Sequence, residues 1–322
     1  MKQPYLEKEK PIAIATFYSF TDIREKSHLC SRIQGICEDE NLLGTVEVSE
    51  EGINCSLSGS KKGLARFLIE LRKIIPRAQI NPHFSSASEP PFRLLKIKER
   101  NELVHPGRHG LSKSNGASVR ALPSEWDALL ADRKVQFLDV RNAYEYRIGS
   151  FIGARETKIN SFAEFANFVV EDINLDKQKP VAIFCTGGIR CEKASLVLEN
   201  AGFEKIIQLE GGILRYLSDS KHVAAHWRGD CFVFDNRVAL DYNLEPSNIT
   251  QCANCRVPLT AADRKEQHFE EGICCRYCHT QTTREKRFSL AERKRQRMLE
   301  SNHDKTHSLK TMLGTPIIKN KP

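Results

Sequence analysis

The chain has 322 residues and a mass of 36.6 kDa, with 40% hydrophobic and 28% charged residues. This length predicts two or three domains, and the composition excludes wholesale disorder. No apolar run approaches the roughly 18 residues of a membrane span, and the charged first ten residues lack the apolar core of a signal peptide. We therefore expect no membrane partner and a cytoplasmic location. There the eleven cysteines would be thiols, metal ligands or catalytic groups rather than disulfides.

Positive charge gathers in two segments of the chain. The net charge is +8, and residues 284–322 alone hold eleven Lys or Arg against four Asp or Glu. A second basic stretch, within 93–120, supplies the candidate RNA-binding residues Lys96, Lys98, Arg100 and Arg108. Two basic segments favour a polyanionic partner, most simply nucleic acid. The alternative is a solvated tail and a charged strand edge.

The first region, residues 1–104, has the element order of a split βαβ, ferredoxin-like α+β domain. The pattern predicts strands over 12–20, 42–49 and 55–59, a turn at 51–54, a further strand or two within 91–104, and helices over 21–40 and 63–75. The second helix is amphipathic, with an apolar face made of Leu64, Phe67, Leu68, Leu71 and Ile75. A linker is expected over 105–121.

The second region, residues 122–222, alternates helices and strands and predicts a parallel-sheet α/β domain. Helices are expected over 123–130, 161–173 and 191–202, and strands over 135–141, 181–185 and 205–209. The strand over 181–185 is apolar throughout, as in a sheet covered on both faces. A cysteine-rich segment over 223–283 and a basic tail over 284–322, with a helix over 287–300, complete the chain.

The loop after the strand over 181–185 predicts a reactive cysteine. Cys185 ends the strand, the loop consists of Thr186, Gly187, Gly188, Ile189 and Arg190, and a helix begins near Cys191. The glycines let backbone amides turn inward at the positive end of the helix. Together with Arg190, which would also hold negative charge during a reaction, they are expected to lower the pKa of Cys185 and make it a nucleophile at the mouth of a pocket. The alternative is a buried cysteine beside an incidental turn.

The size of this loop limits the groups that it can hold. Four residues separate Cys185 from Arg190, one fewer than in cysteine phosphatases, which suits a persulfide or the edge of a small planar group. Cys191 either resolves an oxidised or persulfidated Cys185 or is a small buried helix residue, and we favour the second interpretation. Asp139, Arg141 and Glu145 are expected to tie strand and loop together rather than to react.

Four later cysteines have the spacing of a zinc ribbon. Cys252 and Cys255 form one pair and Cys275 and Cys278 the other, so that two knuckles can close a tetrahedron around structural zinc. Cys274 leaves the register open, and His279 is a possible substitute ligand. The alternative is four free thiols in a disordered segment.

Several motifs together resemble a known family. The run over 137–141, with Glu145, Gly149 and residues 152–154, resembles the rhodanese signature DVR…E…GHIPGA. It departs from that signature with Ser150 in place of the usual His and with no Pro between Ile152 and Gly153. EGIN at 51–54, CTGGIRCEKAS at 185–195, LEGGI at 209–213 and CFVFDNRV at 231–238 appear in order. Over nearly its whole length the chain is similar to the rhodanese-containing, oxygen-dependent tRNA uridine 5-hydroxylase family.

This resemblance implies a fold, an activity and a site. It implies a ferredoxin-like N-terminal domain, a rhodanese domain and a cysteine-rich C-terminal part. The implied activity converts the wobble uridine in the anticodon loop of tRNA to 5-hydroxyuridine, with molecular oxygen as co-substrate and Cys185 as the active-site residue. No flavin or haem motif is seen. The other interpretations are a sulfurtransferase that carries a cysteine persulfide, and a non-catalytic adaptor that binds RNA or protein.

Overall fold

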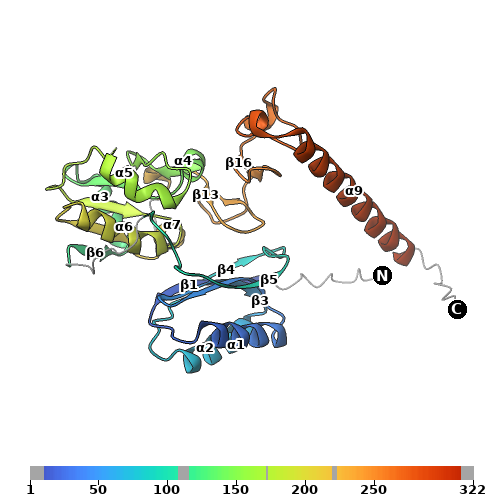
Figure 1. The fold of residues 1–322 in the computed structure, drawn as a ribbon, viewed down its shortest axis with the longest axis horizontal. Helices are drawn as coiled ribbons and strands as arrows, with labels where there is room; N and C mark the ends of the chain where they lie inside the picture. Colours follow the sequence, from blue (N-terminus) through green and yellow to red (C-terminus); the bar gives the residue numbers. More distant parts are fainter. Residues whose placement is uncertain (1–10, 108–115, 172, 220–222, 313–322) are drawn as a thin grey trace, which may run out of the picture. The chain divides into compact units, whose positions relative to one another are not determined.

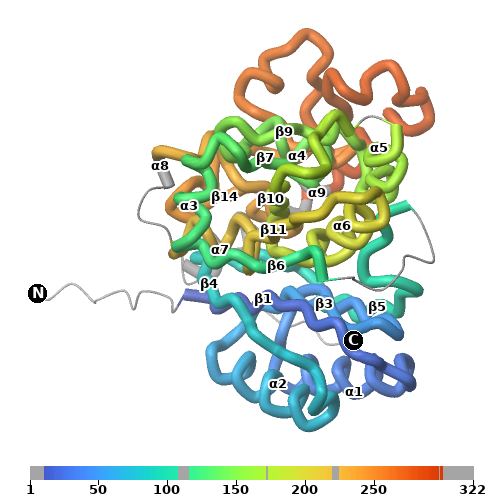
Figure 2. The backbone as a smooth tube through the Cα atoms, turned by 90° about the vertical axis from the view of Figure 1, so that its left-hand side faces the viewer, coloured from blue at the N-terminus to red at the C-terminus, as the bar shows by residue number. Residues whose placement is uncertain are grey.

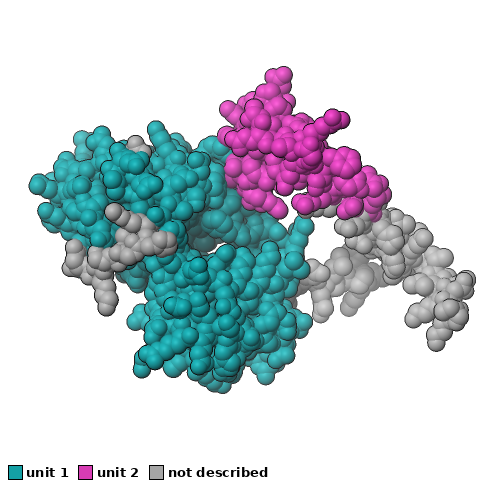
Figure 3. All heavy atoms as spheres, viewed as in Figure 1, with its two compact units in different colours: residues 1–247 teal, residues 248–322 magenta. Residues whose placement is uncertain are grey.

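A computed structural model of the chain describes residues 11–107, 116–171, 173–219 and 223–312 (Figure 1). The chain divides into two compact units, residues 1–247 and 248–322 (Figure 3). Within the described ranges, no helix combines the length and the apolar character needed to cross a membrane. Arg108, one of the predicted RNA-binding residues, lies outside the described residues.

The N-terminal region contains a five-stranded sheet with two helices on one face (Figure 2). Its elements are β1 (Ile12–Phe20), α1 (Lys26–Asp39), β2 (Leu43–Ser49), β3 (Gly52–Gly59), α2 (Lys61–Ile74), β4 (His83–Ala87) and β5 (Leu95–Glu99). The strand order β4-β1-β3-β2-β5 confirms the ferredoxin-like arrangement, extended by β5 at one edge. The expected turn at 51–54 is wrong, because β3 already begins at Gly52. β4 was not predicted, since its sequence HFSSA is mostly polar.

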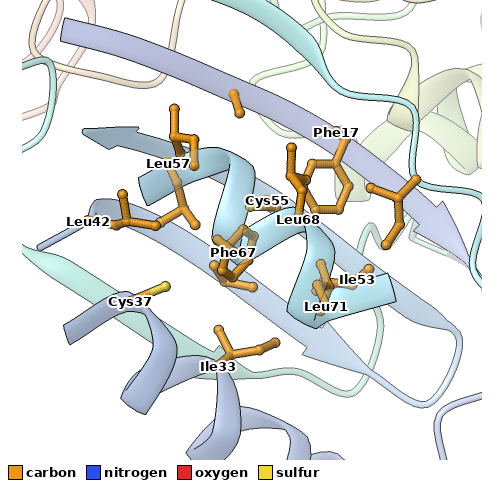
Figure 4. Packing of buried hydrophobic residues seen from close by; sticks show 14 of the residues in the cluster. Phe17, Ile33, Cys37, Leu42, Ile53, Cys55, Leu57, Phe67, Leu68 and Leu71 are labelled. Carbon is orange, nitrogen blue, oxygen red and sulfur yellow. The ribbon is translucent and has the colours of Figure 1, made fainter. Parts of the chain in front are cut away.

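The core of this region lies between the sheet and its two helices (Figure 4). Phe17 of β1 and Ile53 of β3 pack with Phe67 and Leu71 of α2, and Ile33 of α1 is fully buried beside them. Burying one such side chain stabilises the fold by roughly 1.5–3 kcal/mol. Because side chains alternate along a strand, the neighbours of these core residues lie on the opposite, helix-free face of the sheet.

The second region contains a parallel sheet with helices on both faces. Its strands are β6 (Ser118–Ala121), β7 (Gln136–Asp139), β9 (Arg155–Glu156), β10 (Val181–Phe184) and β11 (Ile206–Leu209), in the order β6-β11-β10-β7-β9. One buried cluster joins the sheet to α5 (Phe165–Glu171) and α6 (Ile189–Asn200), and another joins it to α3 (Pro123–Ala131) and α7 (Gly212–Asp219). The parallel α/β architecture is therefore confirmed.

Several boundaries differ from the sequence-based expectations. The last residues of the expected linker over 105–121 form β6, which pairs with β11. α5 is shorter than the helix expected over 161–173, because its first turn is the 3-10 helix η1 (Phe162–Glu164), capped by Ser161. α6 begins at Ile189, two residues before Cys191, so the loop after β10 is shorter than predicted.

The start of the expected cysteine-rich segment packs with the second region instead. Residues 223–247 contain α8 (Val223–His226), β12 (Trp227–Gly229), β13 (Cys231–Phe232) and β14 (Ala239–Leu240). β12 pairs with β8 (Gly149–Phe151), and β13 contacts α4 (Ala143–Ile148). These are non-local contacts between short elements, and neither partner has a strong periodic pattern in the sequence.

The second unit is small and centred on cysteines. Its elements are β15 (Thr250–Gln251), β16 (Pro258–Leu259), the 3-10 helices η2 (Asp263–Lys265) and η3 (His279–Gln281), and α9 (Arg284–Met312). The buried cluster consists of Leu259 and cysteines, with Phe269 and Ile273 beside them. α9 extends past both ends of the helix predicted over 287–300.

Candidate active site and cysteine cluster

The loop between β10 and α6 holds the sulfur of Cys185 against backbone amides. The amide of Gly188, which has a left-handed φ of +97°, donates to Cys185 Sγ at 3.1 Å, and the amide of Arg190 donates as well. Burial by itself raises the pKa of Cys185. A hydrogen bond from Cys191, the charge of Arg190 and the two amides outweigh that effect and lower the pKa to about 6. The thiol is therefore largely ionised at neutral pH.

We expected the sulfur of Cys185 at the mouth of an open pocket, and the structure buries it instead. Cys185 has 0% of its surface exposed. The two described hollows both lie in the N-terminal region, one lined by α2 and β4 and the other by the β1–α1 connection and the end of α2. Access to the thiolate therefore requires a movement of the residues that cover the loop.

Tyr18 of β1 lies directly against this loop. Its hydroxyl donates to Glu192 Oε1 at 2.9 Å, and a Cβ atom added to Gly188 would be only 3.0 Å from the same hydroxyl. Burial and the nearby Glu192 and Cys185 raise the pKa of Tyr18 far above its ordinary value, so the hydroxyl keeps its proton. Sequence reasoning missed Tyr18, because nothing local connects β1 with a loop 170 residues away.

Arg190 has a different partner from the one expected. Its guanidinium forms two hydrogen bonds with the buried carboxylate of Glu145, at 2.6 and 2.8 Å, and a third with Thr186 Oγ1 at 3.2 Å. Burial raises the pKa of Glu145, but the charge of Arg190 and these bonds lower it overall. Both Nη atoms of Arg190 thus face Glu145, and the charge and the amide of Arg190 lower the pKa of Cys185.

Gly212, the first residue of α7, packs against the loop that follows Cys185. Its φ is +67°, and an added Cβ would lie 2.5 Å from the carbonyl oxygen of Cys185 and 2.7 Å from that of Thr186. The amides of Ile213 and Leu214 donate to these two carbonyls at 2.9 and 3.1 Å. The LEGGI segment therefore fixes the loop at a distance that only glycine permits.

A second buried network lies below the loop, as the sequence analysis expected for Asp139 and Arg141. Arg141 donates to both carboxylate oxygens of Asp139, at 2.9 and 2.6 Å, and to the carbonyl of Gly149. Ser150, which stands where the rhodanese signature has His, donates to Asp139 at 2.7 Å. This network links β7 to β8 and holds the end of the strand next to β10.

Cys191 is completely buried in the first turn of α6. Burial, the hydrogen bond to Cys185 and the negative charge of Cys185 raise the pKa of Cys191 well above its ordinary value. Cys191 is therefore a protonated thiol that donates to the Cys185 thiolate. This position agrees with a buried helix residue, and it also places a second sulfur beside the first.

The four predicted metal ligands come together in the second unit. The sulfur atoms of Cys252, Cys255, Cys275 and Cys278 all lie within 4.8 Å of one another. Cys274 points away from them, because its sulfur faces His268 O and Glu270 Oε1 at 3.8 Å. The structure thus settles the register in favour of Cys275, and this cluster can hold a metal ion.

The basic residues of β5 lie on the helix-free face of the N-terminal sheet. Ile97 packs against the core, so Lys96 and Lys98 face the other way. Strand register places Tyr18, Asn54, Glu47 and Lys98 in one row across four strands. Three strand spacings make that row about 14 Å long.

Glu47 partly neutralises these cations. Its carboxylate lies 3.7 Å from Lys98 Nζ and 2.7 Å from Arg100 Nη2. Lys96 is exposed. Lys96, Lys98 and Arg100 are thus brought to the face that also carries Tyr18.

Comparison with known proteins agrees with this geometry. Residues 12–103 match the UPF0176 acylphosphatase-like domain, and residues 122–219 match the rhodanese-like domain. A protein of Teredinibacter turnerae named tRNA uridine(34) hydroxylase is 35% identical over 294 residues, which is 91% of this chain and 92% of that protein. A protein of the same name from Brucella ovis is 36% identical over 286 residues, or 89% of this chain and 94% of that one. The chain, with its rhodanese loop and its acylphosphatase-like domain, belongs to the tRNA uridine(34) hydroxylase family.

Proposed function

We propose that this protein hydroxylates C5 of the wobble uridine in the anticodon loop of tRNA, with the thiolate of Cys185 as nucleophile. The observation that carries the proposal is the ionised sulfur held by the amides of Gly188 and Arg190. It occurs in a chain that matches tRNA uridine(34) hydroxylases over about nine-tenths of its length. A tRNA substrate also supports a cytoplasmic location.

The uracil ring requires activation because C5 is a poor reaction centre by itself. Addition of the Cys185 thiolate forms an S–C6 bond and moves the C5=C6 electron pair toward C5 and O4. Molecular oxygen, as co-substrate, then bonds to C5. One oxygen atom stays as the hydroxyl, and the other leaves as water with two electrons and two protons from a thiol reductant. Loss of the C5 proton and departure of the thiolate restore the C5=C6 bond. A low pKa of Cys185 favours both the first and the last step, since the sulfur adds to C6 as a thiolate and leaves again as a thiolate.

The RNA is proposed to reach this loop across the helix-free face of the N-terminal sheet. Lys96, Lys98 and Arg100 lie at one end of the row that ends at Tyr18, and Arg108 follows them in the sequence. The phosphates of a single-stranded anticodon loop suit the cations at one end of this row. An unstacked base can then turn out toward the Cys185 loop once the residues that cover the loop move. Replacing the lysines with glutamate should weaken tRNA binding and flatten its dependence on salt.

The metal held by the second unit is proposed to be zinc. Four thiolates in two Cys-x2-Cys pairs favour zinc over the oxygen-preferring cations. The unit has only a few buried apolar side chains, so the metal would supply much of its folding energy.

The first test compares nucleosides from tRNA of cells with and without the gene by mass spectrometry. Loss of 5-hydroxyuridine and its derivatives in the deletion strain, restored by the wild-type gene but not by Cys185→Ser, is the expected result. Full restoration by Cys185→Ser would show that the sulfur is not the nucleophile. Loss of a thiolated nucleoside instead would support the second candidate, a sulfurtransferase, which the rhodanese domain and the amide-lined sulfur also suit.

A further inference from the structure

One aromatic ring beside the catalytic loop is exposed for no evident structural reason. Phe234 has 65% of its surface exposed, although its neighbours Phe232 and Val233 are 3% and 4% exposed. Its ring lies next to the loop, because the guanidinium carbon of Arg190 is 5.7 Å from the ring centroid. A single exposed apolar side chain is ordinary, but this ring lies beside Arg190 of the Cys185 loop, where a substrate base could stack on it.

The ring is also held firmly in place. Phe232 packs its edge against Phe234 with centroids 5.0 Å apart, and Tyr144 packs on Phe232 at 5.3 Å. The turn that carries Phe234 is closed by the amide of Val233, which donates to Val238 O at 2.9 Å, and by an Asp235–Arg237 ion pair of 2.6 Å. A platform fixed in this way loses little side-chain entropy when a ligand stacks on it.

The same turn contacts the N-terminal region just before its basic strand. The amide of Asn236 donates to the carbonyl of Pro91 at 2.9 Å, and β5 with Lys96 and Lys98 begins four residues later, at Leu95. Four residues of chain span at most about 14 Å. Phe234 is therefore within a few nucleotides' length of both the catalytic loop and the basic strand.

We propose that Phe234 is the stacking platform for a base of the anticodon loop, the wobble uridine itself, at the moment it is presented to the catalytic loop. This inference rests on the proposed function. It adds a substrate-binding residue outside the rhodanese loop. Uracil offers a flat face without charge, and stacking of single-stranded bases on aromatic side chains is a general mode of RNA recognition. Arg190 on the ring adds a cation–π contact that orients the platform.

The test uses an anticodon stem-loop RNA with 5-iodouridine at position 34, which cross-links under near-ultraviolet light to an aromatic ring stacked on it. The protein is the full chain carrying Cys185→Ser, so that the RNA binds without turnover. We expect the cross-linked peptide to contain Phe234. The cross-link should persist in Phe234→Trp and disappear in Phe234→Ala. It should be unaffected by Phe84→Ala, because Phe84 is a similarly exposed ring (57%) that lies on β4.

Turnover by the otherwise wild-type chain gives a second readout. Removing one stacked base contact lowers binding by roughly 5- to 150-fold. Phe234→Ala should lower kcat/KM for tRNA by that factor, mainly through KM, while the pH profile of Cys185 alkylation stays unchanged. A shifted alkylation profile would show instead that Phe234 only supports Arg190.

The outcomes separate this inference from the proposed function. A cross-link mapped to another residue, with normal turnover by Phe234→Ala, overturns the stacking role and leaves the hydroxylase assignment intact. Absence of any cross-link, together with no 5-hydroxyuridine formed by the wild-type chain, overturns both.

Discussion

The glycine at position 212 offers a direct test of how the loop after Cys185 controls the pKa of its sulfur. Gly212 and Gly153 both have left-handed backbones, with φ of +67° and +83°. In either position alanine costs about 1–2 kcal/mol for the backbone conformation alone. Only at Gly212 does the new Cβ meet backbone, 2.5 Å from the carbonyl oxygen of Cys185, whereas nothing lies within 4 Å of it at Gly153. Gly153→Ala is therefore a matched control.

The expected difference follows from the geometry. Relieving the contact in Gly212→Ala moves the carbonyl of Cys185 by about 1 Å, since an ordinary contact is near 3.5 Å. That shift turns the amides of Gly188 and Arg190 away from the sulfur. If the pKa of Cys185 returned from about 6 to the ordinary 9.0, the thiolate fraction at pH 7 would fall from about 90% to about 1%. A return only as far as 8 would leave about 9% thiolate and should slow alkylation at pH 7 about tenfold.

The assay is the rate of iodoacetamide modification of Cys185 as a function of pH, read by peptide mass spectrometry. Because the thiolate is the reacting form, the wild-type rate should rise with pH through about 6 and level off above 7. Gly153→Ala should have the same profile, and Gly212→Ala a midpoint shifted toward higher pH. Identical midpoints for both variants, with equal losses of stability in urea, would refute the view that loop amides set the pKa.

Three further predictions concern the surroundings of this loop and the cysteine cluster. Glu145→Gln removes the charge that pairs with buried Arg190 and should lower the free energy of unfolding in urea by about 3–5 kcal/mol; a loss below 1 kcal/mol would mean that Arg190 finds water. Tyr18→Ala should speed alkylation of Cys185 by opening the contact at Gly188, while Tyr18→Phe, which keeps the ring, should not; equal rates would place the access route elsewhere. Purified protein should contain about one zinc per chain by elemental analysis, and Cys275→Ser should lose it without altering the Cys185 profile; zinc retained by that variant would point to another ligand set.

Local sequence patterns predicted the features that depend on neighbouring residues. Alternation and helical spacing located β1, α2 and β10, because burial of one face determines those elements almost independently of the rest of the chain. The strand–Cys–Gly–Gly–Arg–helix order predicted a sulfur held by amides, and the Cys-x2-Cys pairs predicted a cluster. These features lie within short stretches of chain, so their chemistry can be read from spacing.

The contacts that cover Cys185 and hold its loop in place could be learned only from the folded chain. Nothing in the residues around Tyr18 predicts that its hydroxyl covers a loop near Gly188, and nothing around Glu145 shows that it binds both donors of Arg190. The polar strand β4, the edge strand β6 and the position of Phe234 likewise depend on pairing with distant segments. Sequence predicted which sulfur the backbone amides hold, because a turn and a helix end create its electrostatics locally. Tertiary structure decided that the sulfur is buried and which side chains surround it, because burial is set by residues far apart in the chain that pack together only in the fold.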